Sequence, residues 1–397
     1  MRLLYTLTAY PPSIGGAQIH THLLAQAMGQ EKLGQKNHVQ VVCHWDSNRT
    51  DWLLGTTLRQ PPAKDYTLDG IPVCRLGYGR LDKLRLLPWL PVYYPLMGLA
   101  LPPIAQRIQQ RLSSVTQKAD VIHFVRTGRE GLSYASWQAA RHYDIPFVLT
   151  PVHHPRWVGW RYRAYLQLYQ QADAVIALTP SEKQTLIELK VAPKKIHVTG
   201  IGPVLADTAD GARFRARYGI DGPMVLFLGQ HYAYKGFSQL LQARHRVWAQ
   251  YPDTWFVFVG PSVRHSEQIF TELTDARILR LGAVDLQTKT DALAACELLC
   301  VPSNQESFGG VFTEAWSFKK PVIGGRIPAI QDVITEGTDG YLVSQASDEI
   351  ADRIIDLLAQ PAKASRMGEA GYKKVESRYT WSVLAAKTQQ VYEAAKL

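Results

Sequence analysis

Residues 302–325 read PSNQESFGGVFTEAWSFKKPVIGG, and this stretch gives the clearest indication of the fold and function of the chain. The apolar residues 298–301 before it predict a short buried strand, and the Ser, Asn and Gly content of 303–310 predicts a loop. Helical spacing follows over 311–318, and a second strand begins at Val322. The stretch therefore predicts a strand, a loop, a helix and a strand in succession.

Two glycines and two acids surround the predicted start of that helix. Gly309 and Gly310 leave its first backbone N–H groups unobstructed at the positive end of the helix dipole, which suits a phosphate. Glu306 in the loop and Glu314 in the first turns can reach hydroxyl groups on opposite sides of that phosphate. The pattern favours a nucleotide-sugar ligand. The alternative is a solvated Glu306 and a Glu314 that merely stabilises the helix dipole.

The string ESFGGVFTEAWSFKKPVIGG resembles the Glu-x7-Glu motif of the retaining glycosyltransferases of family 4. The resemblance implies the α/β architecture called GT-B, in which two Rossmann-like domains with doubly wound parallel sheets face a cleft. It also implies that Glu306 contacts hydroxyls of the donor sugar and that Glu314 contacts the ribose. Backbone amides near the sugar and diphosphate would belong to Phe308, Gly309, Gly310, Val311 and Phe312.

The composition indicates a globular protein with an anionic partner. The chain has 397 residues, which predicts two domains, and its 46% hydrophobic and 20% charged residues are ordinary for a soluble protein. The net charge of +10 predicts an anionic ligand or surface, but no helix-turn-helix, zinc-finger or RNA-binding signature favours nucleic acid. The four cysteines show neither zinc-site nor disulfide spacing, which predicts a cytoplasmic protein.

Strands alternate with helical stretches through the first half of the chain, which predicts a parallel sheet with helices on both faces. Gly15 and Gly16 stand at the start of the first helix, where bare backbone can approach a diphosphate closely. They do not form the Gly-x-Gly-x-x-Gly fingerprint, which argues against a dehydrogenase. By the resemblance, this glycine pair faces the donor phosphates. The predicted strands are residues 3–7, 39–43, 73–76, 121–124, 147–150 and 174–178.

Two histidines follow the predicted strand 147–150, where open parallel sheets bind ligands. Family 4 members often carry Thr-x-His here, with the histidine near the anomeric carbon of the donor. In this chain Val152 occupies the third position, and His153 and His154 come after it. Either histidine can take the role, with a slight preference for His153, and a structural histidine is the alternative. Further ligands at matched spacing are missing from the sequence, so we expect no metal.

The run LFLGQHYAYKGFSQLLQA resembles the family's donor-phosphate element, in which an Arg and a Lys flank a loop. Lys235 occupies the lysine position, but Gln230 stands where Arg is usual. An amide binds a phosphate more weakly than a guanidinium fork does, and Arg264 is a candidate to supply the missing charge. Residues 277–282 match the strand and loop that hold the nucleotide base in the family. The base-binding candidates are Arg280, Leu281 and Gly282.

Residues 80–112 read RLDKLRLLPWLPVYYPLMGLALPPIAQRIQQRL, an aromatic and aliphatic segment broken by prolines and flanked by basic residues. The segment is too interrupted to span a bilayer. It predicts either a surface that lies on an anionic membrane or a helix packed on the N-terminal sheet. In the first case Trp89, Tyr93 and Tyr94 occupy the bilayer interface, and the acceptor is lipid-linked or otherwise amphiphilic.

These patterns predict four segments: a Rossmann-like acceptor domain over 1–202, a linker over 203–222, a Rossmann-like nucleotide-sugar domain over 223–377, and a terminal helix over 378–397 that returns to the first domain. By the resemblance, the enzyme moves a sugar from a nucleotide-diphosphate sugar to a glycan, lipid-linked or other hydroxyl acceptor, with retention and without a metal or other cofactor. The alternatives are a nucleotide-sugar epimerase or hydrolase of the same architecture, or a polyanion-binding protein. The catalytic candidates are Glu306, His153, His154 and Lys235.

Overall fold

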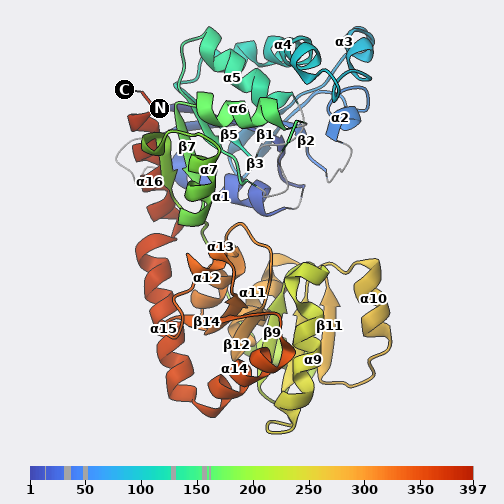
Figure 1. Ribbon diagram of the computed structural model, residues 1–397, viewed down its shortest axis with the longest axis vertical. Coiled ribbons are helices and arrows are strands. Elements are labelled where there is room, and N and C mark those ends of the chain that lie inside the picture. The colour runs from blue at the N-terminus through green and yellow to red at the C-terminus, as the bar shows by residue number, and fades with distance from the viewer. Residues whose placement is uncertain are drawn as a thin grey trace. The chain divides into compact units, whose positions relative to one another are not determined.

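The computed structural model describes two compact units (Figure 1). The first comprises Met1–Gly200 and Trp381–Leu397, and the second comprises Ile201–Thr380. In both units a mainly parallel sheet carries helices on its two faces, as the alternating pattern of the sequence predicts. The described residues are 1–13, 15–30, 37–47, 52–126, 131–153, 159–160 and 162–396.

The sheet of the first unit has the strand order β3-β4-β2-β1-β5-β6-β7-β8 over the described residues. β3 runs antiparallel to β4, and the other neighbouring strands are parallel. The central strands are continuous apolar runs because helices bury both of their faces. The strands are β1 (Arg2–Ala9), β2 (His38–Trp45), β3 (Lys64–Leu68), β4 (Ile71–Arg75), β5 (Val121–Val125), β6 (Phe147–Thr150), β7 (Ala174–Ala177) and β8 (Ile196–Val198).

Helices cover the two faces of this sheet with separate apolar cores. Successive side chains of β1 alternate between them, so that Leu3 and Tyr5 join one core and Leu4 joins the other. α1 and the terminal helix α16 supply the first core, and α4, α5, α6 and α7 supply the second (Figure 1). The helices are α1 (Gly16–Gly29), α2 (Trp52–Gly55), α3 (Arg80–Leu86), η2 (Leu87–Trp89), α4 (Met97–Thr116), α5 (Leu132–His142), α6 (Arg163–Gln171), α7 (Pro180–Glu188), η3 (Pro193–Lys195) and α16 (Trp381–Ala394).

The sheet of the second unit has the order β11-β10-β9-β12-β13-β14 in the described residues, with parallel neighbours throughout. Its first strand, β9, therefore lies at the centre. The chain passes outward from β9 to β10 and β11, then returns to place β12 on the other side of β9. The strands are β9 (Met224–Leu228), β10 (Trp255–Val259), β11 (Ile278–Gly282), β12 (Leu298–Val301), β13 (Val322–Gly325) and β14 (Gly340–Val343).

Residues 203–222, which the sequence suggests as a linker, lie within the second unit. α8 packs against α11, and Arg213 of α8 donates to Asp291 of α11 at 2.6 Å. α9 packs against α14, and α12 packs against α15. The helices of this unit are α8 (Gly211–Tyr218), η4 (Ala233–Lys235), α9 (Phe237–Trp248), α10 (Arg264–Thr271), α11 (Leu286–Ala295), α12 (Gly310–Trp316), α13 (Pro328–Gln331), α14 (Ser347–Ala359) and α15 (Pro361–Arg378).

The aromatic residues of segment 80–112 do not form the exposed surface that the membrane interpretation assigned to them. Tyr93 is fully buried, and its hydroxyl contacts that of Tyr165 in α6. Trp89 and Tyr94 are half-buried and pack against the same core. The packing interpretation therefore describes these three side chains better. No helix within the described ranges is both long enough and apolar enough to cross a bilayer.

Candidate active site

The strand order of the second unit brings together two loops that are distant in sequence. β9 and β12 are hydrogen-bonded neighbours, and the chain leaves their carboxyl ends in opposite directions. Open α/β sheets bind their ligands at such a switch point, outside the carboxyl ends of the strands. The loop after β9 carries Gln230 and Lys235, and the loop after β12 carries Glu306. The topology thus explains why these residues form one site.

Hydrogen bonds hold the two loops against each other. The carbonyl oxygen of Tyr234 accepts from the backbone N–H of Asn304 at 2.9 Å and from Nε2 of Gln345 at 3.0 Å. Nε2 of Gln345 also donates to the carbonyl of Pro302 at 2.9 Å. Gly236 has a φ of 78°, and a Cβ at this position would lie 2.6 Å from that same carbonyl. Glycine therefore allows the close approach that places Lys235 beside the second loop.

Lys235 and Glu306 form a direct ion pair across the two loops. Their side chains are only 19% and 13% exposed, so the pair is largely shielded from water. The Lys235 ammonium also lies 5.7 Å from the centre of the Tyr234 ring, within cation–π range. The structure therefore joins the predicted sugar-contacting acid to the predicted phosphate-binding cation.

Glu314 forms a second, deeper pair with a lysine that sequence reasoning missed. Its Oε1 accepts from Nζ of Lys289 at 2.9 Å, and Lys289 also donates to the carbonyl of Val204 at 2.6 Å. Burial raises the pKa of Glu314, and the charge of Lys289 opposes that rise. Lys289 follows the N-cap residue Asp285 of α11 by four positions, a common pattern that gave no signal of a role in binding.

The second carboxylate oxygen of Glu314 is buried but unpaired among the described residues, and we call an unpaired acceptor of this kind open. Glu314 is 6% exposed, and its Oε2 has no hydrogen-bond partner in the described part of the chain. Buried polar atoms are normally satisfied, so an open carboxylate oxygen suits the hydroxyl group of a ligand.

Gly309 caps α12 in a left-handed conformation, with φ of 82° and a hypothetical Cβ 2.5 Å from the Phe312 ring. Phe308 packs edge-to-face on Tyr379, with ring centres 5.3 Å apart, and Phe312 is fully buried. These aromatic side chains belong to the core, so only their backbone amides can face a ligand. The N–H groups of Gly310 and the next residue, Val311, lie in the first turn, where helices lack internal acceptors.

The remaining donor and base candidates lie on other elements of the second unit. Gln230 is exposed after β9, and Arg264 is the exposed first residue of α10. Arg280 of β11 donates to Glu267 at 2.5 Å, so its charge is already paired. The next residues, Leu281 and Gly282, end this edge strand. Their binding of a base and the role of Arg264 stay predictions.

The loop that carries Gln230 is anchored by His231, a fully buried side chain. Its ring stacks on Phe237 and tilts against Phe270, with centre distances of 5.8 and 5.4 Å. Neither ring nitrogen has a hydrogen-bond partner within the described ranges. Burial, assisted by the charge of Arg280, lowers the pKa of His231 to about 4. A neutral histidine therefore fixes the loop as an aromatic side chain would.

In the first unit, Gly15 and Gly16 begin α1, and no side chain caps this helix. Gly15 is extended, with φ of 179°, and the side chain of Gln18 occupies the space beside its Cα, where a Cβ would lie 2.3 Å from Oε1. Val152, just after β6, has a φ of 49°, a conformation that β-branched residues rarely adopt. Both features lie beyond the carboxyl ends of strands, as the sequence predicts.

His153 is buried and held by its neighbours. Its backbone N–H donates to Oε1 of Glu182 at 2.6 Å, while the N–H of Leu178 donates to Oε2 at 2.7 Å. Nδ1 of His153 lies 3.4 Å from the hydroxyl of Tyr169. Burial raises the pKa of Glu182 to about 7, against the effect of the two backbone N–H groups. A catalytic role for His153 stays a prediction, and His154 lies outside the described residues.

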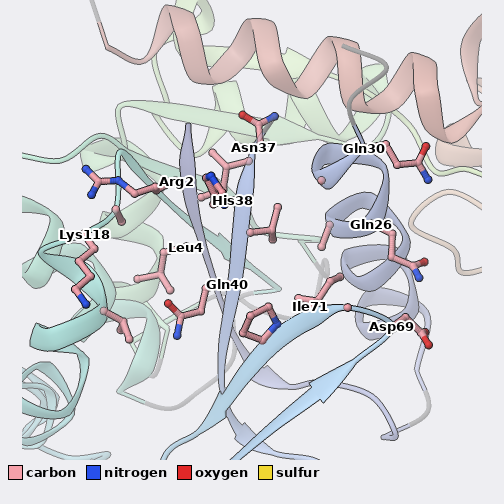
Figure 2. Close-up of a pocket in the computed structure, with 18 residues that line it drawn as sticks. Arg2, Leu4, Gln26, Gln30, Asn37, His38, Gln40, Asp69, Ile71 and Lys118 are labelled. Atoms are coloured by element: carbon pink, nitrogen blue, oxygen red, sulfur yellow. The ribbon is translucent and has the colours of Figure 1, made fainter. Parts of the chain in front are cut away.

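A pocket of about 620 Å³ opens at the other, amino-terminal edge of the first sheet (Figure 2). Arg2, His38 and Ile71, at the starts of three strands, line it together with Lys118. The described residues that line the pocket include none of the predicted site residues. Among the residues that the structure describes, no group of three or more His, Cys, Asp and Glu side chains is placed to hold a metal ion. All four cysteines are free thiols.

Two sequence families match most of the chain. The family described as "Glycosyl transferases group 1" matches residues 212–374, and "Glycosyl transferase 4-like domain" matches residues 15–202. The chain belongs to the group 1 glycosyltransferases. Family membership supports glycosyl transfer over the epimerase, hydrolase and polyanion-binding alternatives.

One relative of this glycosyltransferase matches it over its full length, and another matches about two thirds of it. It is 25% identical to a glycogen synthase of Mycobacterium tuberculosis over 422 residues, covering 100% of this chain and 95% of that protein. It is 28% identical to a D-inositol 3-phosphate glycosyltransferase of Xylanimonas cellulosilytica over 294 residues, covering 66% and 69% of the two chains.

Solved structures confirm the predicted GT-B fold. The Anabaena protein HepE in complex with UDP-glucose superposes with a TM-score of 0.73 at 18% identity, covering 99% of this chain and 98% of that one. Sucrose-phosphate synthase from Thermosynechococcus elongatus gives a TM-score of 0.73 at 20% identity, with the same coverage.

Proposed function

We propose that this glycosyltransferase moves a sugar from a nucleotide-diphosphate sugar to a hydroxyl acceptor with retention of the anomeric configuration. The observation that carries the proposal is the Lys235–Glu306 ion pair at the switch point of the second sheet. Glu314, with an open carboxylate oxygen, adds a further acceptor for a ligand hydroxyl in the same unit. A cation for a diphosphate and carboxylates for hydroxyl groups are what such a donor requires.

Lys235 is the group that stabilises the departing diphosphate. When the bond to the anomeric carbon breaks, negative charge develops on the leaving oxygen, and a cation already in place needs no reorganisation. A bound diphosphate competes with Glu306 for Lys235, and Glu306 then accepts hydrogen bonds from the sugar hydroxyls. Attack by the acceptor from the leaving-group face, as the family resemblance implies, retains the configuration without a protein nucleophile.

Glu314 binds the ribose through Oε2, and Lys289 holds the carboxylate in position through Oε1. The amides at the start of α12, including that of Gly310, contribute a positive dipole end for the phosphates. The proposal includes independence of a metal ion, because Lys235 and these amides supply positive charge where the diphosphate lies.

The acceptor in this proposal is a glycan or a lipid-linked saccharide, and the enzyme acts in the cytoplasm or at the inner face of its membrane. The net charge of +10 supports anionic partners in general, the donor included. HepE, which shares the fold, was solved with UDP-glucose bound, and UDP-sugars are therefore the first donors to test.

Thermal unfolding with a panel of UDP-, GDP- and ADP-sugars tests the proposal. A ligand at a hundred times its Kd adds about 2.7 kcal/mol to the free energy of unfolding. We expect one nucleotide class to raise the Tm, with and without EDTA, and expect Glu314→Ala to reduce the rise at the same ligand concentration. The anomeric configuration of the product, read by NMR, tests retention. If no nucleotide sugar shifts the Tm, the donor assignment is wrong.

A further inference from the structure

We propose that α3, η2 and the start of α4 form a docking surface for an anionic lipid bilayer. Half of the ten large hydrophobic side chains that are exposed in the described part of the chain fall between residues 81 and 99. Each of them is between 49% and 69% exposed. We call them the leucine segment; they are Leu81, Leu84, Leu87, Leu96 and Leu99.

The leucine segment is not needed for the packing of α3 and α4 on the first unit. α3 already buries Leu86, which is 1% exposed, and α4 buries Met97 and Ala100 completely. Leu81 and Leu84 lie three residues apart, so they share the side of α3 that points away from this core. Both helices therefore pack on the first unit through other side chains, and the exposed leucines play no part in that packing.

Neighbouring contacts keep the leucine segment together. α3 packs against both η2 and α4. Arg111, on α4, donates to Asp82 of α3 at 2.6 Å, and Lys83 donates to the carbonyl of Gln60 at 3.2 Å. Figure 1 shows α3 and α4 next to each other at the edge of the first unit. The exposed leucines are thus held on ordered secondary structure.

The charge around these leucines identifies the partner. Residues 80–111 carry five basic side chains and one acid, Asp82. Arg80 and Arg85 are exposed and make no ion pair within the described ranges. Apolar side chains interleaved with cations are the pattern of a segment that lies in the interface of an anionic bilayer. A second copy of this chain is disfavoured, because a symmetric contact would bring the same cations together.

The mode of binding follows from the lengths of the elements. α3 has seven residues, and no described helix can span a bilayer. The surface therefore lies on the membrane. Tyr93, which the sequence pointed to as an anchor, is fully buried, so the leucines take the inserting role. The inference deepens the proposed function, on which it rests, by naming a bilayer as the place where an amphiphilic acceptor is met.

Co-sedimentation of the full chain with vesicles tests the inference. The vesicles are phosphatidylcholine alone, or with about one-third phosphatidylglycerol, at low and high salt. We expect the wild type to pellet with the anionic vesicles at low salt and roughly tenfold less without phosphatidylglycerol or at high salt. If the wild type stays in the supernatant with anionic vesicles at low salt, the inference is wrong.

Two variants with matched controls distinguish the contribution of the inserting leucines to vesicle binding from that of the basic side chains. Leu81→Ser/Leu84→Ser should weaken vesicle binding roughly tenfold or more, whereas Leu54→Ser, an exposed leucine of α2, should not. Arg80→Glu/Arg85→Glu should abolish the preference for phosphatidylglycerol. Its control, Lys118→Glu/Lys194→Glu, makes the same change of charge at exposed positions of the same unit. Unchanged binding by the leucine variant would overturn the inference.

Two further readouts keep this inference distinct from the donor assignment. The Tm shift with a nucleotide sugar should be the same in the leucine variant and the wild type, because Leu81 and Leu84 lie outside the second unit. Vesicle binding without any donor shift would refute the donor assignment and leave the docking surface standing. A wild-type dimer in light scattering that Leu81→Ser/Leu84→Ser dissociates, without vesicle binding, would show a second copy as the occupant and refute the inference.

Discussion

The carboxyl edges of the two sheets differ in how they hold their polar residues. In the second unit, Glu306 and Glu314 each face a lysine, and Glu314 keeps one oxygen open. In the first unit, His153 is buried, its backbone N–H is held by Glu182, and its ring lies against Tyr169. The second edge offers paired charges that a ligand can rearrange, while the first edge uses its hydrogen bonds internally.

This difference predicts a ligand-binding role for the carboxyl edge of the second sheet and a structural role for that of the first. A lysine paired with a carboxylate can exchange its partner, since a diphosphate can replace the carboxylate at the lysine. A carboxylate that satisfies two backbone N–H groups has no such freedom, because its removal leaves buried donors unpaired. We therefore expect substitutions at the second edge to change turnover and donor affinity, and those at the first edge to change stability.

The largest effect is expected from Lys235→Ala. Loss of a fixed cation beside a developing negative charge should lower kcat by roughly 10²–10³-fold. Glu306→Ala should also act mainly on kcat, and Gln230→Ala should cost less than either, because an amide carries no charge. Steady-state kinetics with the donor found in the thermal panel measures all three. A kcat of Lys235→Ala close to that of the wild type would show that the ion pair is structural.

Glu314→Ala should weaken donor binding with a smaller change in turnover. Loss of a hydrogen bond to a charged group costs about 1.5–3 kcal/mol, which is roughly 10- to 150-fold in Kd. Isothermal titration with the free nucleotide measures this affinity. Glu272→Ala removes an exposed acid from the same unit and serves as the control. Equal and small effects of Glu314→Ala and Glu306→Ala on affinity and rate would contradict the division of roles.

In the first unit, His123 belongs to a buried hydrogen-bond network, and we expect its contribution to the stability of this unit to depend on pH. Nδ1 of His123 lies 2.7 Å from the hydroxyl of Tyr392, and Nε2 lies 2.7 Å from Oγ1 of Thr150. Burial, with a smaller effect of His20, lowers the pKa of His123 to about 3. The unfolded chain therefore binds this proton more readily, so the stabilisation is complete above pH about 6.5 and is lost as the pH falls toward 3.

His123→Asn should expose this dependence in urea unfolding. Near pH 7.5 the variant should be less stable by about 1–3 kcal/mol, because buried partners lose their hydrogen bonds. The difference should shrink by roughly 2 kcal/mol on going to pH 5, at about 1.4 kcal/mol per pH unit. Donor affinity at pH 7.5 should not change. A difference that stays constant with pH would argue against a neutral buried His123.

The smallest effect concerns the strained residue before His153. Val152→Gly should raise the free energy of unfolding by about 1 kcal/mol, because relief of a left-handed conformation outweighs the entropy cost of glycine. For a unit of this size that is roughly 2–4 °C in Tm. Val198→Gly, in the extended strand β8, should destabilise and serves as the control. A lower Tm for Val152→Gly would mean that packing of the valine side chain dominates.

Much of the fold could be predicted because buried parallel strands are apolar runs. The predicted strands 147–150 and 298–301 coincide with β6 and β12. β3 and β8 were missed, since β3 is a mostly exposed edge strand and β8 has only three residues, and β14, which begins with a glycine, was also missed. The sequence also predicted Glu306, Glu314 and Lys235 as site residues, because each lies in a local pattern of loop and helix start.

The tertiary structure alone decided which side chains meet and which face outward. Lys235 and Glu306 are 71 residues apart, and their pairing depends on the neighbouring positions of β9 and β12 in the sheet. Lys289 could not be recognised, because its partner lies on another helix. Residues 86–101, which read LLPWLPVYYPLMGLAL, carry no charged side chain, so periodicity could not indicate which face points inward. In the structure, Tyr93 packs against Tyr165 and points inward, and the leucine segment is exposed.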